Sequence, residues 1–84
     1  MDDLKNELKQ LIIDECDKDY SVDEITDDEV LVGGKLDLDS LDMLQAAMAI
    51  KARYGVRIEG STASRRAFKS INALADYIQK HQAA

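Results

Sequence analysis

The sequence predicts an all-α fold, a bundle of three major helices with one additional short helix and a long first loop. Apolar residues recur three and four positions apart in three segments, 3–16, 40–53 and 70–81, as they do along one face of an α-helix. The chain has no proline, so the predicted boundaries rest on helix caps and glycines. A chain of 84 residues suits one small domain, which we expect over residues 1–84.

The first helix is predicted over residues 3–16. Its apolar stripe has the spacing i, i+4, i+7 and i+8 and consists of Leu4, Leu8, Leu11 and Ile12. Asp2 and Asp3 suit the positive end of the helix dipole. This amphipathic pattern predicts a helix with one face in the core.

Residues 17–38 predict a long connection that is anchored to the core. Acidic residues keep it in water, whereas scattered apolar residues can hold it against the helices. A helical turn is expected near residues 23–27. Residues 30–32 have the composition of a short strand but no evident partner, so we expect a loop there. Gly33 and Gly34 predict a turn, because glycine takes positive φ without penalty.

The second helix is predicted over Ser40–Arg53, with Asp39 as its N-cap. Asp42 follows Asp39 at the spacing of a capping box, with aspartate in the place of glutamate. Gly55 is positioned to end the helix. The sequence Asp39-Ser40-Leu41-Asp42 therefore places a serine in the first turn, between two carboxylates.

The second helix carries two apolar stripes, although an ordinary amphipathic helix needs only one. The stripe expected in the core consists of Met43, Ala46, Ala47, Ile50 and Tyr54. The other consists of Leu41, Leu44 and Met48 and lies beside Ser40. We expect this second stripe to be at least partly exposed as a surface for other proteins. The alternative is that neighbouring helices bury both stripes.

Two further helices are predicted in the C-terminal part. A short one is expected over Ser61–Phe68, capped by Ser61 or Ser64. The last is expected over Ser70–His81, with Ser70 as its N-cap. Its apolar stripe consists of Ile71, Leu74, Ala75 and Ile78.

Charge is divided unevenly along the chain. Residues 1–44 contain 15 Asp and Glu but 4 Lys and Arg, whereas residues 45–84 contain 2 and 7. The acidic half disfavours nucleic acids and anionic membranes, and it would attract a basic patch on a partner protein. The sequence has no apolar run of about 18 residues and no signal-peptide pattern. A single cysteine, Cys16, agrees with a reducing compartment, and we expect a cytoplasmic monomer.

The sequence offers no catalytic constellation. No pair of Cys or His residues has zinc spacing, and residues 23–29 lack the ligand pattern of a calcium loop, so no metal site is predicted. The only histidine, His81, is far in sequence from Ser40. A serine without a base, at the start of a helix, is better suited to being modified than to attacking a substrate. We therefore expect a protein that is not an enzyme.

Leu38-Asp39-Ser40-Leu41-Asp42, the apolar helix after it and Tyr54-Gly55-Val56-Arg57-Ile58 resemble the acyl carrier proteins. The C-terminal Ala73-Leu74-Ala75-Asp76-Tyr77-Ile78 is also similar to that family's last helix. The resemblance covers essentially the whole chain. It implies an acyl-carrier-like helical bundle in which Ser40 carries 4′-phosphopantetheine, installed from coenzyme A by a phosphopantetheinyl transferase with magnesium near Asp39.

The resemblance also implies how such a carrier would work. Acyl intermediates of fatty-acid, lipid or polyketide-type biosynthesis would be held as thioesters on the arm. Partner enzymes such as ketosynthases, reductases, acyltransferases or acyl-ligases would recognise a surface formed by Asp39, Leu41, Asp42, Leu44, Gln45 and Met48. An acyl chain would be sheltered by Ala46, Ala47, Ile50, Ile58, Phe68, Ile71 and Leu74, although small alanines also simply allow close helix packing.

The chain departs from the family where many fatty-acid carriers have glutamates along the second helix. Here the residues are Gln45, Lys51, Ala52 and Arg53. This difference predicts a specialised carrier with its own partners. The cargo stays open among specialised lipid, polyketide or aryl-polyene chains, an aminoacyl group of a peptide synthetase, and a divergent fatty-acid chain. The alternative function is an unmodified interaction module that binds through Leu41, Leu44 and Met48.

Overall fold

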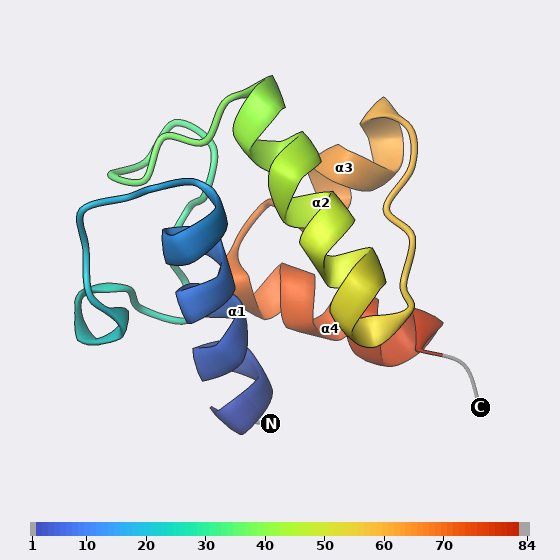
Figure 1. Ribbon diagram of the computed structural model, residues 1–84, viewed down its shortest axis with the longest axis horizontal. Helices are drawn as coiled ribbons and strands as arrows, with labels where there is room; N and C mark the ends of the chain where they lie inside the picture. The colour runs from blue at the N-terminus through green and yellow to red at the C-terminus, as the bar shows by residue number, and fades with distance from the viewer. Residues whose placement is uncertain (1, 83–84) are drawn as a thin grey trace.

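The fold consists of helices joined by loops throughout residues 2–82, the part of the chain that the computed structural model describes (Figure 1). The elements are α1 (Asp2–Glu15), the short 3-10 helix η1 (Val22–Glu24), α2 (Ser40–Tyr54), α3 (Ser61–Ala67) and α4 (Ile71–His81). The prediction of an all-α bundle with three major helices, one short helix and a long first loop is confirmed.

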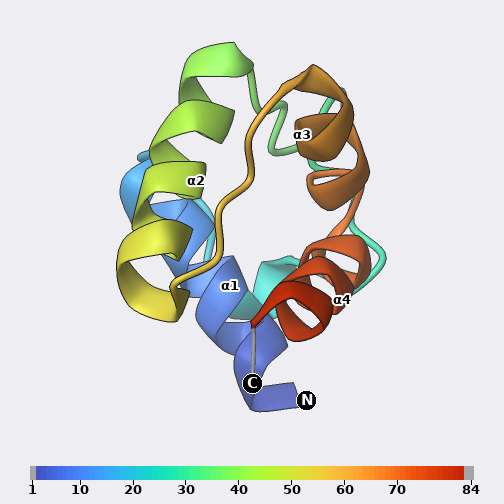
Figure 2. The same ribbon diagram turned by 90° about the vertical axis from the view of Figure 1, so that its right-hand side faces the viewer.

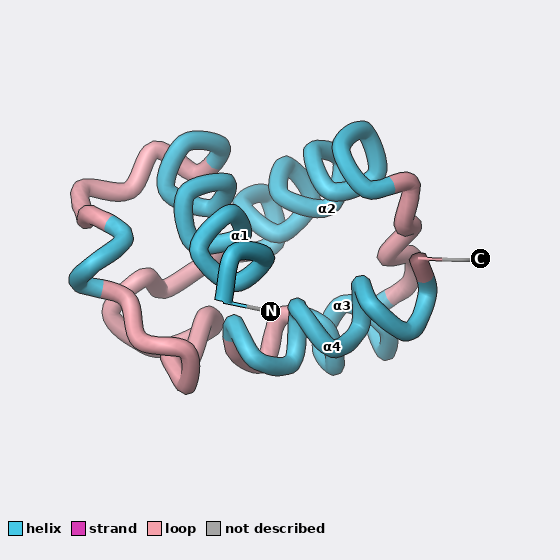
Figure 3. Tube along the Cα trace, turned by 90° about the horizontal axis from the view of Figure 1, so that it is seen from below, coloured by secondary structure: helices cyan, strands magenta, loops and turns pink. Residues whose placement is uncertain are grey.

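Helix α1 packs against both α2 and α4, so it forms the centre of the bundle (Figures 1 and 3). Leu8, Leu11 and Ile12 are buried on the face that the sequence predicted. The helix ends at Glu15, one residue earlier than expected. Asp17 adopts φ 52°, a left-handed conformation that directs the chain out of the helix.

The long loop between α1 and α2 is anchored by buried apolar side chains, as predicted. They are Ile25, Leu31, Leu36 and Leu38. The expected helical turn is the 3-10 helix η1, slightly earlier than residues 23–27. A capping box begins it, because the Ser21 N–H donates to Glu24 Oε1 over 2.9 Å. Gly33 adopts φ 85° in the turn predicted there.

Polar contacts join this loop to the start of α4. The Asn72 N–H donates to the carbonyl oxygen of Asp27 over 2.9 Å, and the Asn72 side chain donates to Asp28 Oδ1 over 2.7 Å. Val30 forms an isolated antiparallel bridge with Ser70. Residues 30–32 thus form no strand, but Val30 has a partner that the sequence did not reveal.

Lys9 ties α1 to the same part of the loop. Its Nζ lies 2.8 Å from Asp27 Oδ1, although only 8% of the residue is exposed. Burying a lysine is unfavourable unless its charge has a partner. The Lys9 contact to Asp27 supplies that partner and holds the loop close to α1.

Helix α3 begins differently from the prediction. Gly60 is its N-cap, with φ 88°, and no side chain caps the helix. The expected cap from Ser61 or Ser64 is therefore wrong, since both serines lie inside the helix. By contrast, Ser70 caps α4 as predicted, with its Oγ accepting from the Ala73 N–H over 3.0 Å.

The core lies between α1, α2 and α4 and is closed on one side by Phe68 at the end of α3. Its fully buried apolar residues also include Ala46 and Ile50 of α2. A connection, residues 55–60, runs from α2 to α3 (Figure 2). Gly55 begins this connection with φ 72° and its N–H donates to the Lys51 carbonyl, which confirms the predicted end of α2.

Candidate functional site at the start of α2

A capping box fixes the first turn of α2. The Asp42 N–H donates to Asp39 Oδ1 over 2.8 Å, and the Asp39 N–H donates to Asp42 Oδ2 over 3.3 Å. Both carboxylates are thereby held at the helix start, where the dipole favours negative charge. Ser40, between them in sequence, is the first residue of α2 and is exposed.

An ion pair and a hydrogen bond connect the inner side of this turn to residues just after α1. Lys18 Nζ lies 3.1 Å from Asp42 Oδ2. The Cys16 thiol donates to the Asp42 carbonyl oxygen over 3.4 Å. The turn is therefore held from beneath by Cys16 and Lys18, while its outer side, with Ser40, remains free for other molecules.

These contacts shift the pKa values of the groups involved. Burial opposes ionisation of Asp42, but hydrogen bonds from Lys18 and Asp39 outweigh it and lower the pKa of its carboxyl. The bond to Asp42 raises the pKa of Lys18. Burial, followed by the negative charge of Asp42, raises the pKa of the Cys16 thiol to about 11. Cys16 is buried, and its raised pKa disfavours the reactive thiolate.

The apolar stripe next to Ser40 is exposed. The exposed fractions are 61% for Leu41, 56% for Leu44 and 63% for Met48. The other stripe faces the core, where Ala46 and Ile50 are buried. The expected division of α2 into a core face and an exposed apolar face is confirmed, and the alternative in which both stripes are buried is wrong.

A groove of about 510 Å³ opens beside Ser40, between α2 and α3. One wall comes from α2 and the other from the connection and α3. The lining residues are Ser40, Met43, Leu44 and Ala47 of α2, Ile58, Glu59 and Gly60 of the connection, and Ser61, Ser64 and Arg65 of α3. One wall is mainly apolar, whereas the wall from α3 presents hydroxyl groups and a guanidinium.

The residues predicted to shelter an acyl chain fall into two groups. Ala47 and Ile58 line the groove. The others are fully buried in the core: Ala46, Ile50, Phe68, Ile71 and Leu74. The sequence did not point to Ser61, Ser64 or Arg65 as groove residues. Their only signal was a run of short hydroxyl and basic residues in a short helix.

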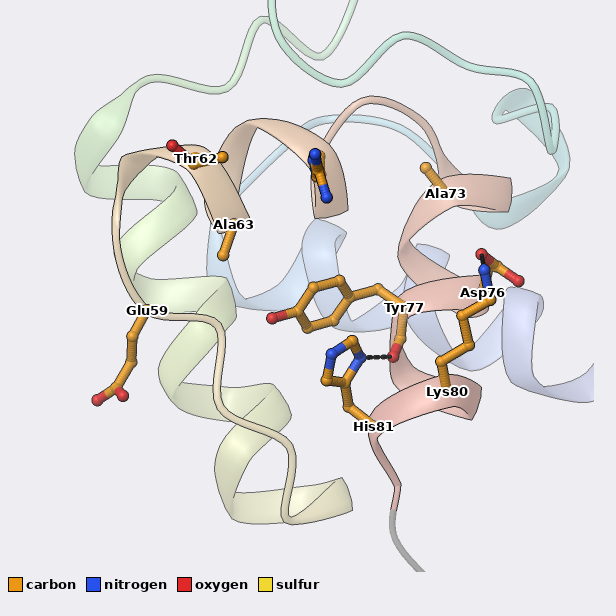
Figure 4. A pocket seen from close by; sticks show the side chains of 9 residues that line it. Glu59, Thr62, Ala63, Ala73, Asp76, Tyr77, Lys80 and His81 are labelled. Carbon is orange, nitrogen blue, oxygen red and sulfur yellow. Dashed lines mark hydrogen bonds and ion pairs between the residues drawn. The ribbon is translucent and has the colours of Figure 1, made fainter.

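A second depression lies between α3 and α4 (Figure 4). His81 stacks on Tyr77 with ring centroids 4.1 Å apart, and His81 Nδ1 lies 2.9 Å from the Tyr77 carbonyl oxygen. Arg66 and Lys80 line this depression together with Glu59 and Asp76, so positive and negative charges balance. His81 belongs to this depression and does not line the groove of Ser40.

Comparison with protein families decides what kind of chain this is. Residues 6–78 match the model of the family described as phosphopantetheine attachment site. The chain belongs to this phosphopantetheine attachment family. Comparison with curated protein sequences gives no match. The match confirms the resemblance to acyl carrier proteins, because these carriers hold a covalent 4′-phosphopantetheine group.

The residues at the start of α2 fit such a group. A phosphodiester link needs an accessible hydroxyl with open space beside it, and Ser40 is exposed at the edge of the groove. The group, when bound, supplies a terminal thiol that can hold an acyl group as a thioester. Phosphopantetheine carriers of this kind typically have no catalytic activity of their own.

Two features are absent from residues 2–82. No helix there has both the length and the apolar character to cross a membrane. No three His, Cys, Asp or Glu residues in this part of the chain are grouped so that they could hold a metal ion.

Proposed function

We propose that this phosphopantetheine carrier is an acyl carrier protein whose arm is attached to Ser40. It holds acyl intermediates as thioesters and delivers them to enzymes of fatty-acid, lipid or polyketide-type biosynthesis. It has no enzymatic activity of its own and works as a cytoplasmic monomer. The observation that carries this proposal is the exposed Ser40 hydroxyl at the first residue of α2, next to an open groove.

The surroundings of Ser40 support attachment at this serine. The capping box and the contacts to Lys18 and Cys16 hold the turn rigidly, so a transferase meets a preformed surface. Asp39 has the position at which the family resemblance implies a carboxylate near the transferase's magnesium. Within residues 2–82, Glu59 is the one carboxylate that lines the groove and no histidine lines it, which supports Ser40 as the acceptor of the arm rather than as a nucleophile.

The exposed side of α2 supports a role in partner recognition. The exposed apolar stripe, formed by Leu41, Leu44 and Met48, begins directly beside Ser40. Next to this stripe, at its Ser40 end, lie Asp39, Asp42 and Gln45. A partner enzyme that docks here would have the arm at the entrance of its active site. The phosphopantetheinyl transferase would use the same surface.

The far end of α2 supports a specialised partner set. Lys51, Ala52 and Arg53 are exposed there, and Lys51 and Arg53 are positively charged. Partners with a basic surface along the whole helix would be repelled at this end by Lys51 and Arg53. Enzymes that bind this carrier would therefore present basic residues towards Asp39 and neutral or acidic residues towards Arg53.

Intact mass spectrometry tests the proposal. The purified chain is incubated with coenzyme A, magnesium and a phosphopantetheinyl transferase of broad specificity. The mass should rise by one phosphopantetheine group, and Ser40→Ala should abolish the increase.

Ser61→Ala is the matched control, because Ser61 is an exposed serine of the same groove. It should leave the mass increase unchanged. An increase that persists in Ser40→Ala would place the arm elsewhere and contradict the proposal.

A further inference from the structure

We propose that the groove beside Ser40 is a resting site for the phosphopantetheine arm, with the Arg65 guanidinium binding the arm's phosphodiester. This inference rests on the proposed attachment at Ser40 and adds a binding residue from a different helix. Ser40 and Arg65 line the same groove, from α2 and α3 respectively. A phosphodiester on Ser40 would thus form at the edge of a groove that already contains a guanidinium.

Arg65 is free to bind an anion. The ion pairs within residues 2–82 are formed by lysines: Lys5, Lys9, Lys18, Lys35 and Lys80. Arg65 makes no ion pair or side-chain hydrogen bond in this part of the chain, although Glu59 also lines the groove. Its planar fork of N–H donors matches two oxygens of a phosphodiester, which makes arginine well suited to this group.

The charges around Ser40 create a need for such a cation. A phosphodiester at Ser40 adds negative charge beside Asp39 and Asp42. Lys18 lies 3.1 Å from Asp42 and compensates its charge, whereas Asp39 takes part in none of the ion pairs within residues 2–82. Repulsion from Asp39 would direct the phosphodiester away from the capping box. The groove lies next to Ser40, and Arg65 is the cationic residue in its lining.

The remaining groove residues suit the rest of the arm. Ser61 and Arg65 are four positions apart in α3 and so share one face of the helix, and Ser64 lies next to Arg65. Their hydroxyls can exchange hydrogen bonds with the amides of the arm. The opposite wall is apolar, with Met43, Leu44 and Ala47, and can contact its methyl-bearing carbon chain.

A docked arm has a consequence for the carrier's use. Part of the exposed stripe, Leu44, also lines the groove, so the arm would cover it at rest. A partner that docks on Leu41 and Met48 would compete for Leu44 and release the arm into its own active site. Arg65 would thus hold the arm on the carrier between encounters.

Arg65→Gln and Arg66→Gln form a matched pair for the test. The two arginines are adjacent and exposed, and each variant removes one positive charge from α3. Arg65 lines the groove of Ser40, whereas Arg66 lines the depression near Tyr77. Circular dichroism should show both variants folded, because both side chains are exposed. Arg65→Lys, which keeps the charge and loses the fork, is a further variant.

The full chain is labelled for NMR and loaded with the arm, and mass spectrometry verifies the loading. Loading should shift the amide resonances of residues 58–65 and the Nε–H of Arg65, in addition to those next to Ser40. Arg65→Gln should remove the shifts at residues 58–65 and move the phosphorus resonance of the phosphodiester, whereas Arg66→Gln should do neither. Raising salt to about 1 M, where the Debye length is about 3 Å, should weaken the effect in the unaltered protein.

The outcomes separate this inference from the proposed function. If Ser40 is loaded but residues 58–65 do not shift, or if both glutamine variants behave alike, the resting site is wrong and the carrier function stands. If the arm does not attach to Ser40, both are wrong. If only Arg65→Gln removes the shifts, the resting site is supported, and a partial loss in Arg65→Lys would show that the guanidinium fork contributes beyond its charge.

Discussion

Helices α2 and α4 are similar in sequence character but use their apolar residues differently. Both are N-capped, and both have apolar residues at helical spacing. Helix α4 buries its whole stripe, whereas α2 buries Ala46 and Ile50 and leaves Leu41, Leu44 and Met48 exposed. The apolar content of a helix therefore does not tell whether it serves the core, because the neighbouring elements decide what is covered.

The difference follows from the packing around each helix. Helix α4 packs against both α1 and α3, and the first loop contacts its start. Helix α2 packs against α1, but a groove separates much of its outer side from α3. Leu41, Leu44 and Met48 are mostly exposed and contribute little to folding, so their presence beside Ser40 is best explained by binding.

Truncating one leucine in each helix should give the largest difference. Leu74→Ala in α4 removes a fully buried side chain and should lower the free energy of unfolding by about 2–5 kcal/mol. Leu44→Ala in α2, where the leucine is mostly exposed, should change it by less than about 0.5 kcal/mol. Urea denaturation measures both values. Equal losses would show that the stripe beside Ser40 belongs to the core.

The two sides of α2's first turn should also differ in reactivity. Cys16 lies beneath the turn with a pKa raised from 9.0 to about 11, so at about pH 8 it should be alkylated by iodoacetamide about 100-fold more slowly in the folded than in the unfolded chain. A loaded arm would present an ordinary, accessible thiol on the outer side.

Alkylation of the arm-free protein, followed by mass spectrometry with and without urea, measures the two rates for Cys16. Similar rates in the two states would mean that the inner side of the turn is open to solvent. The contact between Cys16 and the Asp42 carbonyl would then contribute little.

Much of this fold could be predicted because its signals are local. Asp39 and Gly55 mark the two ends of α2, and Ser70 marks the start of α4, each through a cap that involves only nearby residues. The start of α3 was harder to predict, because Ser61 and Ser64 are both typical N-cap residues and the actual N-cap is Gly60. The loop's attachment to α4 was not predictable, since Asp27 and Asn72 are far apart in sequence.

The site could be predicted in part for the same reason. The position of Ser40 follows from the local Asp39 and Asp42 pattern. The groove depends on how α3 lies relative to α2, which the sequence does not encode locally, and so Arg65 was missed. The family resemblance placed Phe68 and Ile50 in the expected acyl pocket by their position, and both are fully buried in the core.

The N-caps of the two helices provide a comparison with a smaller effect. Asp39→Ala and Ser70→Ala each remove a side chain that accepts a helix N–H, at 2.8 and 3.0 Å. Each should lower the free energy of unfolding by about 1 kcal/mol. Only Asp39→Ala should also slow loading by the transferase, because Ser70 caps a different helix and does not line the groove of Ser40. If Ser70→Ala slows loading as much as Asp39→Ala does, the assignment of the start of α2 as the loading site is wrong.

Acid should destabilise the starts of both helices, and this effect should be small near neutral pH. Asp42 at the start of α2 and Asp27 near the start of α4 have pKa values below 3.8, each with a lysine contact; for Asp27 the bond from Lys9 is the main cause. The folded chain then binds fewer protons than the unfolded chain. This stabilisation is present above about pH 4 and is lost as the pH falls through the folded-state values.

Thermal unfolding between about pH 7 and about pH 3 measures this loss. Asp42→Asn and Asp27→Asn should each lower the melting temperature at neutral pH and make it less dependent on acid. A variant whose acid dependence equals that of the unaltered protein would show that its carboxylate does not contribute.

Fragmentation mass spectrometry of the loaded chain tests the central claim most directly, because three serines line the same groove. The phosphopantetheine group should be found on Ser40 alone, at the exposed first residue of α2. A group located on Ser61 or Ser64 of α3 would contradict the assignment of α2 as the helix that carries the arm.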